Sequence, residues 1–362
     1  MGFFHKKETH GFLGVDIGTS GIKLVELAPH KDRPVVLTYG FTQWHTGQEP
    51  FSFLDDPVRA GKLLQDLHKQ TGATSRKAMA SLPLSTVFSG IIAVPNMKTE
   101  REMRSLIDAQ VAKLTPIPLS DMSIDPTYID GKPWEGSSPK LKERGFSRVL
   151  VTGASRTQLQ KYIDLFKAAQ IELPAIDTES FALIRSLVGK DPGASLLMDI
   201  GSMRTNFTIV ENGTPFLTRS VNIGGHLITR QIMDQMHVNQ DDAERMKMDL
   251  SSFTGESVLP GGLPPVLEAL MQPLTHEIRY AMQLYANMDL RESERIERVV
   301  VTGGSSLLPR IPQYLSEVLN MNVYHGDPWA RTLYPEALRP VLDEIGPRMA
   351  VAIGLALREF SS

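Results

Sequence analysis

The sequence Gly14-Val-Asp-Ile-Gly-Thr-Ser-Gly-Ile-Lys23 is the clearest structural pattern in this chain. An apolar strand is predicted over residues 12–16 and a second strand over residues 22–27, with a turn of glycine and hydroxyl residues between them. Glycine at 18 and 21 lets the backbone turn tightly and point its amides at one place. The pattern therefore predicts a β-hairpin with a glycine-rich turn.

The side chains of this turn suit an anionic ligand. Gly18 and Gly21 allow backbone amides to face a phosphate, Thr19 and Ser20 add hydroxyl donors, and Lys23 is long enough to reach the same anion. Asp16 then fits a carboxylate that binds Mg²⁺ through a water ligand, because magnesium gives up its hydration reluctantly. The alternative is a plain tight hairpin with an Asx turn.

A second copy of the pattern begins at residue 195. The apolar run Leu196-Leu197-Met198 reaches Asp199, turns through Ile200-Gly201-Ser202 and continues as a strand over residues 205–210. Two hairpins this similar predict an internal duplication. Asp199, Gly201 and Ser202 offer the same acid and amides, so we expect the two hairpins to clasp a polyphosphate from opposite sides.

A third glycine turn, Val301-Thr-Gly-Gly-Ser-Ser-Leu-Leu-Pro-Arg310, follows the strand predicted over residues 298–302. It has no carboxylate, and its small residues Gly303, Gly304 and Ser305 would let a flat ring approach the backbone closely. A helix C-cap or an ordinary loop is the alternative. The chain has neither the lysine motif of P-loop proteins nor the G-x-G-x-x-G of dinucleotide-binding folds, which disfavours both classes.

The rest of the chain alternates strand and helix patterns, which predicts α/β layers with covered sheets. Amphipathic periodicity predicts a helix over residues 99–114, ended by Pro116 and Pro118, and glycine and proline predict a polar surface loop over residues 130–144. Further helices are expected over residues 58–69, 157–169, 177–187, 241–248, 265–288 and 311–319.

Composition excludes several classes of protein. A chain of 362 residues with 41% hydrophobic and 22% charged residues is long enough for two or more domains. Its formal charge of −3 and lack of a basic run disfavour a nucleic-acid partner. It has no cysteine, no secretory h-region and no stretch of apolar residues long enough for a membrane span. We therefore expect a cytoplasmic protein that reaches a membrane only through a partner.

The order of the three turns resembles the phosphate-1, phosphate-2 and adenosine motifs of the actin, Hsp70 and sugar-kinase superfamily. The resemblance implies ATP and Mg²⁺ bound between two duplicated, ribonuclease H-like α/β domains, with Asp16 and Asp199 on the metal side. It implies an actin-like fold with an FtsA-type inserted subdomain. The expected division is a first domain over 1–85 that returns at 172–195 and in a C-terminal helix at 340–362, an insertion over 86–171, and a second domain over 195–340 with a helical subdomain near 225–290.

Two further segments resemble parts of bacterial actin relatives that lie near the nucleotide. They are Gly224-Gly225 followed by Thr229, and Ala243-Glu-Arg-Met-Lys247. By this resemblance Glu244 and Lys247 are candidate ribose or adenine contacts. The alternative for these two residues is an ordinary exposed salt pair on a helix.

Two other stretches resemble the PilM family of type IV pilus proteins. They are Thr99-Glu-Arg-Glu with Gln110-Val-Ala-Lys-Leu-Thr-Pro-Ile-Pro-Leu-Ser-Asp121, and Ile176-Asp-Thr-Glu-Ser-Phe-Ala-Leu183. The resemblance implies a cytoplasmic adaptor for pilus assembly and twitching motility that docks the N-terminal tail of an inner-membrane PilN-like protein. It also implies contact with a PilO-linked complex and motor ATPases, and a homo-oligomeric ring. The regions 90–94 and 114–119 are the predicted docking region.

The chain departs from hydrolytic members of the superfamily at one place that matters for chemistry. Such members commonly have a second acid three positions after the phosphate-2 aspartate, where this chain has Ser202, followed by the bulky Met203. We therefore expect ATP binding with at most weak ATPase activity. Asp177 and Glu179 lie where relatives position the attacking water, and each is a candidate general base or a helix cap.

Three rival functions share this superfamily. An FtsA-like division protein would end in an amphipathic membrane helix, whereas this sequence ends at Arg358-Glu-Phe-Ser-Ser362. A sugar or acetate kinase would need a catalytic acid and an acceptor pocket, which Ser202 and the insertion disfavour. A filament-forming actin of the MreB type would carry a different insertion.

Overall fold

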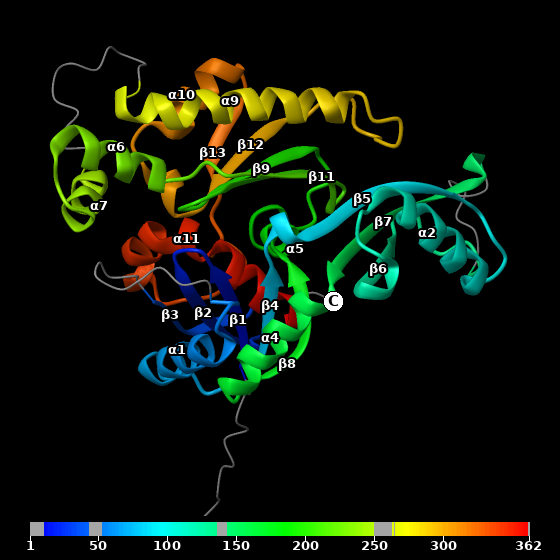
Figure 1. The fold of residues 1–362 in the computed structure, drawn as a ribbon, viewed down its shortest axis with the longest axis horizontal. Coiled ribbons are helices and arrows are strands. Elements are labelled where there is room, and N and C mark those ends of the chain that lie inside the picture. The colour runs from blue at the N-terminus through cyan, green and yellow to red at the C-terminus, as the bar shows by residue number, and fades with distance from the viewer. Residues whose placement is uncertain (1–10, 43–52, 136–142, 250–262, 264, 361–362) are drawn as a thin grey trace, which may run out of the picture. The chain divides into compact units, whose positions relative to one another are not determined.

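The computed structural model describes residues 11–42, 53–135, 143–249, 263 and 265–360 (Figure 1). Packing divides the chain into two units. The first unit contains residues 1–81, 161–189 and 326–362, and the second contains residues 82–160 and 190–325. This division follows packing alone, so the domain boundaries expected from the sequence stay a prediction.

The first unit contains a five-stranded sheet in the order β3-β2-β1-β4-β8. β1, β2 and β3 form an antiparallel meander, and β4 pairs with β1 in parallel. The predicted first hairpin is therefore present. The bounds are β1 Phe12–Gly18, β2 Gly21–Ala28, β3 Val35–Phe41, β4 Lys77–Leu82 and β8 Glu172–Thr178.

The second unit repeats this arrangement in a sheet of order β11-β10-β9-β12-β13. β9, β10 and β11 are again antiparallel, and β12 and β13 extend the sheet in parallel. The duplication predicted from the two glycine hairpins is thus seen in both sheets. The bounds are β9 Ser195–Ile200, β10 Thr205–Glu211, β11 Thr214–Val221, β12 Arg298–Thr302 and β13 Asn322–His325.

Apolar helices cover the first sheet. The long helix α11 is buried along most of its second half and packs on Val25 and Leu27 of β2. The Asp56 side chain caps α1 by accepting from the Arg59 amide. The helix predicted over residues 177–187 begins later, because β8 extends through Thr178. The bounds are α1 Pro57–Gln70, α4 Arg156–Ala168, α5 Glu179–Leu183, the π-helix Ile184–Val188, the 3₁₀ turns Glu336–Leu338 and Arg358–Phe360, and α11 Arg339–Leu357.

The helices of the second unit bury a separate core against its sheet. The middle of α9 supplies Leu267, Leu270, Leu274 and Ile278, which pack with Phe207 of β10. The bounds are α6 His226–Met236, α7 Gln240–Met248, α9 Pro265–Ala286, the 3₁₀ turn η4 Gly304–Leu307 and α10 Ile311–Leu319.

A third, three-stranded sheet of order β5-β7-β6 lies within the predicted insertion. Helix α2 covers one face and buries Met103, Ile107 and Val111 against it. A capping box between Thr99 and Glu102 starts this helix. The bounds are the 3₁₀ turn η1 Leu84–Thr86, β5 Val87–Pro95, α2 Glu100–Leu114, the 3₁₀ turn η2 Leu119–Asp121, β6 Met122–Tyr128 and β7 Phe146–Ser155.

A buried ion network joins this third sheet to the rest of the second unit. Arg148 of β7 bonds Asp130 at 2.6 Å, Glu292 at 2.9 Å and the carbonyl of Leu290 at 2.9 Å. The side chain of Asp130 is only 3% exposed. The prediction of a polar surface loop over residues 130–144 is therefore wrong at its first residue, because the carboxylate turns inward to pair with Arg148. Residues 136–142 of that loop lie outside the described residues.

Candidate functional site

The first glycine turn closes the hairpin of β1 and β2 in the first unit. Gly18 and Gly21 are cross-strand partners, and the exposed Thr19 and Ser20 form the turn between them. A Cβ atom on Gly21 would lie 2.3 Å from the carbonyl oxygen of Thr42, so this position has no room for a side chain. The turn therefore presents its hydroxyls and amides at one end of the sheet, as the sequence predicts.

Asp16 and Lys23 form an ion pair beside this turn. They face each other across β1 and β2, with Lys23 Nζ 2.6 Å from Asp16 Oδ2, and their side chains are 13% and 7% exposed for the lysine and the aspartate. A Cβ atom on Gly18 would lie 3.0 Å from Lys23 Nζ, which places the ammonium group against the turn itself. The structure thus brings together the predicted metal-side carboxylate and the predicted phosphate-binding cation.

Asp177 and Glu179 lie at the junction of β8 and α5. Asp177 Oδ1 accepts from the amide of Thr178 at 2.8 Å, and its Oδ2 accepts from Arg185. Burial and the nearby charge of Arg358 lower the pKa of Arg185 to about 10. The carboxylate of Asp177 is therefore held in an ion pair that fixes the junction, whereas Glu179 is the first residue of α5 and half-buried.

The second glycine turn, between β9 and β10, is bonded to the start of α6. The amide of Gly201 donates to the carbonyl of Arg204 at 2.9 Å and closes the turn. The amide of Gly225 then donates to the Gly201 carbonyl at 3.0 Å, and the amide of His226 donates to the Ser202 carbonyl at 2.7 Å. A Cβ atom on Gly224 would lie 2.6 Å from the Ser202 carbonyl oxygen. The two predicted segments are thus in direct contact.

The third glycine turn joins the same cluster. Ser305 Oγ donates to the carbonyl of Gly201 at 2.9 Å. Gly303 has φ +89°, and a Cβ atom there would lie 2.3 Å from Asp199 Oδ1, while one on Gly225 would lie 2.2 Å from Ser305 Oγ. Gly304 begins η4 immediately after this turn. Three segments that are distant in sequence therefore meet at the ends of β9 and β12.

Glu244 and Lys247 extend this cluster from α7. Lys247 Nζ lies 2.6 Å from Glu244 Oε2 and donates to Thr229 Oγ1 at 2.8 Å, while Thr229 Oγ1 also lies 2.6 Å from Glu244 Oε1. The amide of Thr229 donates to the Gly225 carbonyl at 3.3 Å. The lysine side chain is 12% exposed and the glutamate side chain 41% exposed, so the pair is enclosed at the lysine and open at the glutamate. We call the second and third turns, Gly224-Gly225 and this pair the turn cluster.

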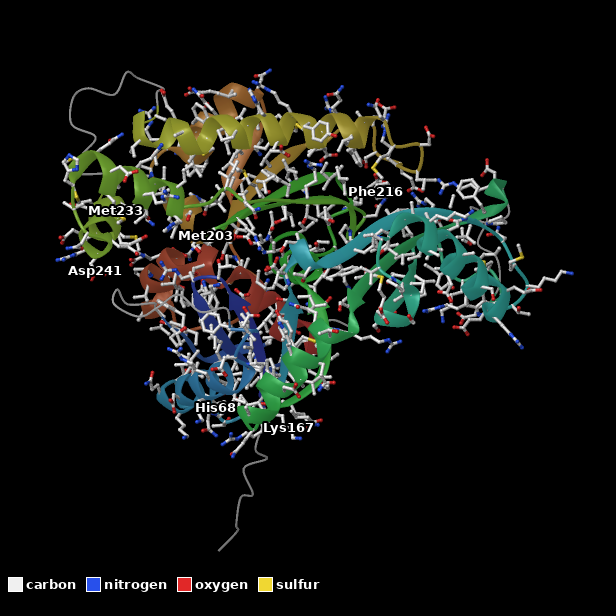
Figure 2. All side chains as sticks on the ribbon, in the orientation of Figure 1. His68, Lys167, Met203, Phe216, Met233 and Asp241 are labelled. Atoms are coloured by element: carbon white, nitrogen blue, oxygen red, sulfur yellow. The ribbon has the colours of Figure 1, made fainter. Side chains whose placement is uncertain are left out.

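Sequence reasoning missed two residues that hold the turn cluster in place. Arg204 follows the exposed Met203 of the second turn (Figure 2) and bonds Asn222 Oδ1 at 3.2 Å and the hydroxyl of Ser85. His325 Nε2, at the end of β13, lies 2.8 Å from the Ser306 carbonyl oxygen. Both residues make these contacts with partners at least 18 positions away in the sequence, so no local sequence signal indicates them.

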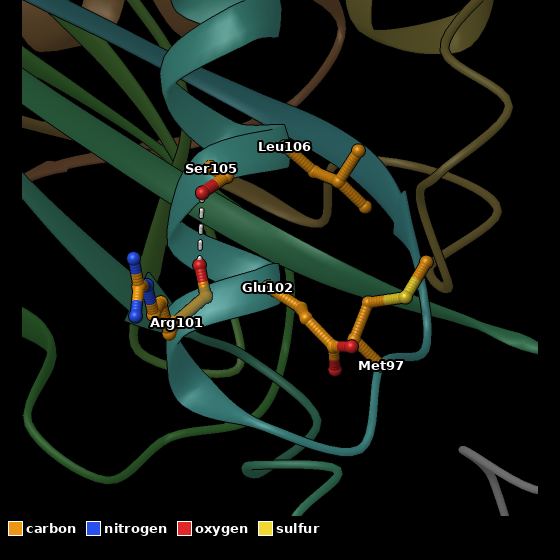
Figure 3. A pocket seen from close by; sticks show the side chains of 5 residues that line it. All are labelled: Met97, Arg101, Glu102, Ser105 and Leu106. Atoms are coloured by element: carbon orange, nitrogen blue, oxygen red, sulfur yellow. Dashed lines mark hydrogen bonds between the residues drawn. The ribbon is translucent and has the colours of Figure 1, made fainter.

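A pocket of about 350 Å³ lies on α2 and the residues before it, and none of its lining residues is among those predicted to bind nucleotide. It is lined by Met97, Arg101, Glu102, Ser105 and Leu106 (Figure 3), and Ser105 Oγ bonds the Arg101 carbonyl.

Among the described residues, no group of three acidic or histidine side chains is placed to hold a metal ion by itself. No helix in the described parts of the chain is both long and apolar enough to cross a bilayer.

The comparisons with known proteins give one family match and relatives of one fold. Residues 14–360 match the family model described as type IV pilus assembly protein PilM. The cell division protein FtsA of Bacillus subtilis (strain 168) is 24% identical over 357 residues, covering 88% of this chain and 78% of FtsA. FtsA of Borreliella burgdorferi is 23% identical, covering 74% of this chain and 69% of that protein.

Solved structures give the same result for the fold. A chain of the PilM–PilN type IV pilus biogenesis complex has a TM-score of 0.79 at 21% identity, covering 96% of this chain and 97% of that one. The ethanolamine utilization protein EutJ of Carboxydothermus hydrogenoformans has a TM-score of 0.53 at 15% identity, with coverage of 95% and 88%. MreB 5 of Spiroplasma citri bound to AMPPNP has a TM-score of 0.51 at 15% identity, with coverage of 98% and 97%. The fold is that of the actin-like ATPases.

Proposed function

Because this chain belongs to the type IV pilus assembly protein PilM family, we propose that it is an ATP-binding adaptor that docks the N-terminal tail of an inner-membrane PilN-like protein. The observation that carries the proposal is the family match over residues 14–360. The similar chain from the PilM–PilN complex and the convergence of the glycine turns in the second unit support it.

The turn cluster is the proposed adenine-nucleotide site of the second unit. Gly303, Gly304 and Ser305 leave room for a flat base, with Glu244 and Lys247 as the ribose-side contacts. The amides around Gly201 and Ser202 are the phosphate donors. The AMPPNP bound to MreB 5 of Spiroplasma citri belongs to the class of nucleotide that this site would take.

In this proposal the first unit supplies residues that bind a phosphate oxygen and Mg²⁺. Lys23 binds a phosphate oxygen, and Asp16 holds Mg²⁺ through water. Asp199 is the proposed metal-side carboxylate of the second unit. Bound magnesium would neutralise phosphate charge. A carboxylate acting through water needs no cluster of direct protein ligands, so the side chains present fit this mode of binding.

Hydrolysis is proposed to be weak or absent. Ser202 stands where an acid would serve as a base, and the side chain of Met203 is 47% exposed on the same turn. Asp177 is already engaged in an ion pair with Arg185 at the junction of β8 and α5. Glu179 remains the candidate base on α5.

The partner peptide is proposed to dock on the third sheet. β5, which contains the predicted region 90–94, is an edge strand of this sheet, and an edge strand can pair with an extended peptide. Leu114 and Ile117, in the other predicted region, are 55% and 41% exposed and offer apolar contacts. Docking there would bring this proposed cytoplasmic protein to the inner membrane through its partner. It would then lie beside a PilO-linked complex and motor ATPases. A homo-oligomeric ring is part of the same proposal.

Calorimetric titration of a PilN-like N-terminal peptide, with and without MgATP, tests this function. We expect saturable binding that Ile117→Asp weakens, whereas Val58→Asp, an equally drastic change on the exposed face of α1, leaves it intact. A protein that binds MgATP but shows no affinity for the peptide would contradict the adaptor role. That result would favour an FtsA-like role, which the likeness to Bacillus subtilis FtsA over 88% of this chain makes the second candidate.

A further inference from the structure

Arg204 occupies a position in the second unit where a cation can meet a bound phosphate. It is the last residue of the turn between β9 and β10, and its carbonyl accepts the amide of Gly201. Its half-buried side chain donates from Nε to Asn222 Oδ1 at 3.2 Å and from Nη1 to the hydroxyl of Ser85. The guanidinium group therefore lies beside the second glycine turn, held by two side chains from other segments.

The charge of Arg204 is not compensated in this structure. Its two side-chain partners are a neutral amide and a neutral hydroxyl, and no carboxylate of the described residues lies within 4.0 Å of it. Lys247, the other cation of the turn cluster, is instead paired with Glu244 at 2.6 Å. A guanidinium group forms stronger, bidentate hydrogen bonds with phosphate than with neutral acceptors, so an arriving phosphate would compete successfully for Arg204.

We propose that Arg204 is a phosphate sensor, which binds the terminal phosphate of a nucleoside triphosphate and releases Ser85 when it does so. This inference rests on the proposed nucleotide site and adds a binding residue and a means of regulation to it. A diphosphate lacks the terminal group, so the bond between Arg204 and Ser85 would persist when a diphosphate is bound.

Release of Ser85 would reach the third sheet directly. Ser85 lies in η1, the short turn that leads into β5, the edge strand proposed to pair with the partner peptide. η1 and β5 both pack beside β11, whose end carries Asn222. The tether between Arg204 and Ser85 thus links the second glycine turn to the strand that enters the docking sheet.

The first test compares the affinities of the full chain for ATP and ADP with magnesium. Loss of a charge-assisted hydrogen bond is worth about 10-fold or more in binding, so we expect wild type to prefer ATP by about that factor and Arg204→Gln to bring the ratio close to 1. Arg219→Gln is the matched control, because Arg219 lies on the neighbouring strand β11 and pairs with Glu277. An ATP to ADP ratio that Arg204→Gln leaves unchanged would overturn the inference. Failure of wild type to bind either nucleotide would instead overturn the proposed function.

The second test measures amide hydrogen exchange of η1 and the start of β5. In wild type, ATP should speed exchange there relative to ADP, because only ATP withdraws Arg204 from Ser85. Ser85→Ala should exchange fast with either nucleotide while retaining a preference for ATP, and Arg219→Gln should behave as wild type does. Exchange in η1 that is the same with ATP and ADP in wild type would refute the tether.

Discussion

Replacing Gly303 by alanine should damage the turn cluster through both backbone strain and close contacts. Gly303 has φ +89°, which an L-residue adopts only with strain. Because Gly303 has no side chain, the carboxylate of Asp199 and the carbonyl of Ile200 lie in the space that a side chain would fill. An added Cβ atom would be 2.3 Å from Asp199 Oδ1 and 2.5 Å from the Ile200 carbonyl oxygen.

The cost has two parts that a control can separate. Placing alanine at φ +89° and ψ 155°, a region that essentially only glycine adopts, costs about 1–3 kcal/mol, and forcing Asp199 or the backbone of Ile200 to move adds about 1–3 kcal/mol. Gly131 in the same unit has φ +92° and nothing within 4 Å of its Cβ position. Gly131→Ala therefore carries only the cost of backbone strain. We therefore expect Gly303→Ala to destabilise the second unit by about 2–6 kcal/mol and Gly131→Ala by about 1–3 kcal/mol.

Native-state hydrogen exchange of amides in β9 and β12 is the suitable assay, because it reports the second unit without assuming that the two units unfold together. Nucleotide titration of the same two variants gives the functional readout. Gly303→Ala should also lose nucleotide affinity, since the displaced Asp199 is the proposed metal-side carboxylate of this unit. Equal destabilisation by the two substitutions would refute the argument that Gly303 is required by close packing against Asp199.

Three other changes have expected outcomes. Asp16→Asn leaves the ammonium group of Lys23 without its partner in a site that is mostly buried, so the first unit should lose about 3 kcal/mol and magnesium should no longer strengthen nucleotide binding in a thermal melt. Burial alone would raise the pKa of Asp130, but the hydrogen bonds and charge of Arg148 lower it below its usual value. Its contribution to stability is therefore present above the unfolded pKa of about 3.9 and is lost as the pH falls through the folded pKa. An acid-unfolding series should show this loss in wild type but not in Asp130→Asn, and identical acid slopes would contradict it. Tyr162→Phe removes a buried hydroxyl that has no hydrogen-bond partner among the described residues, so urea unfolding should show no loss of stability; a loss above about 1 kcal/mol would mean that this hydroxyl is bonded.

The features that sequence predicted are those with a local cause. The hairpins at Gly18 and Gly201 follow from an apolar strand, an aspartate and a glycine turn within ten residues, and both sheets contain them. The helix predicted over residues 99–114 follows equally from its apolar periodicity and is present as α2, Glu100–Leu114. The order of the three turns then indicated the actin-like fold, because it resembles the order of the phosphate-1, phosphate-2 and adenosine motifs of that superfamily.

The features that sequence did not predict depend on contacts between distant segments. Asp130 looks like a loop residue until Arg148, 18 positions away, draws it inward. Arg204 looks like a turn residue until it meets Ser85, 119 positions earlier. A long side chain can reach many partners, so its sequence neighbours do not specify which one it binds. A glycine where two backbone segments approach closely is required because it has no side chain. The neighbouring residues of its turn motif often indicate this requirement.

The carbonyl of Gly201 shows why the second glycine turn, the third glycine turn and the Gly224-Gly225 segment form one cluster. It accepts from the Gly225 amide at 3.0 Å and from Ser305 Oγ at 2.9 Å, so both lone pairs of this oxygen are used by segments that lie 24 and 104 positions further along the chain. A displacement of the second turn therefore moves the other two. A phosphate that repositions the turn would shift the base-binding segment at Ser305 and the start of α6 at Gly225 together. Arg204, whose own carbonyl bonds the Gly201 amide, would carry the same displacement toward Ser85.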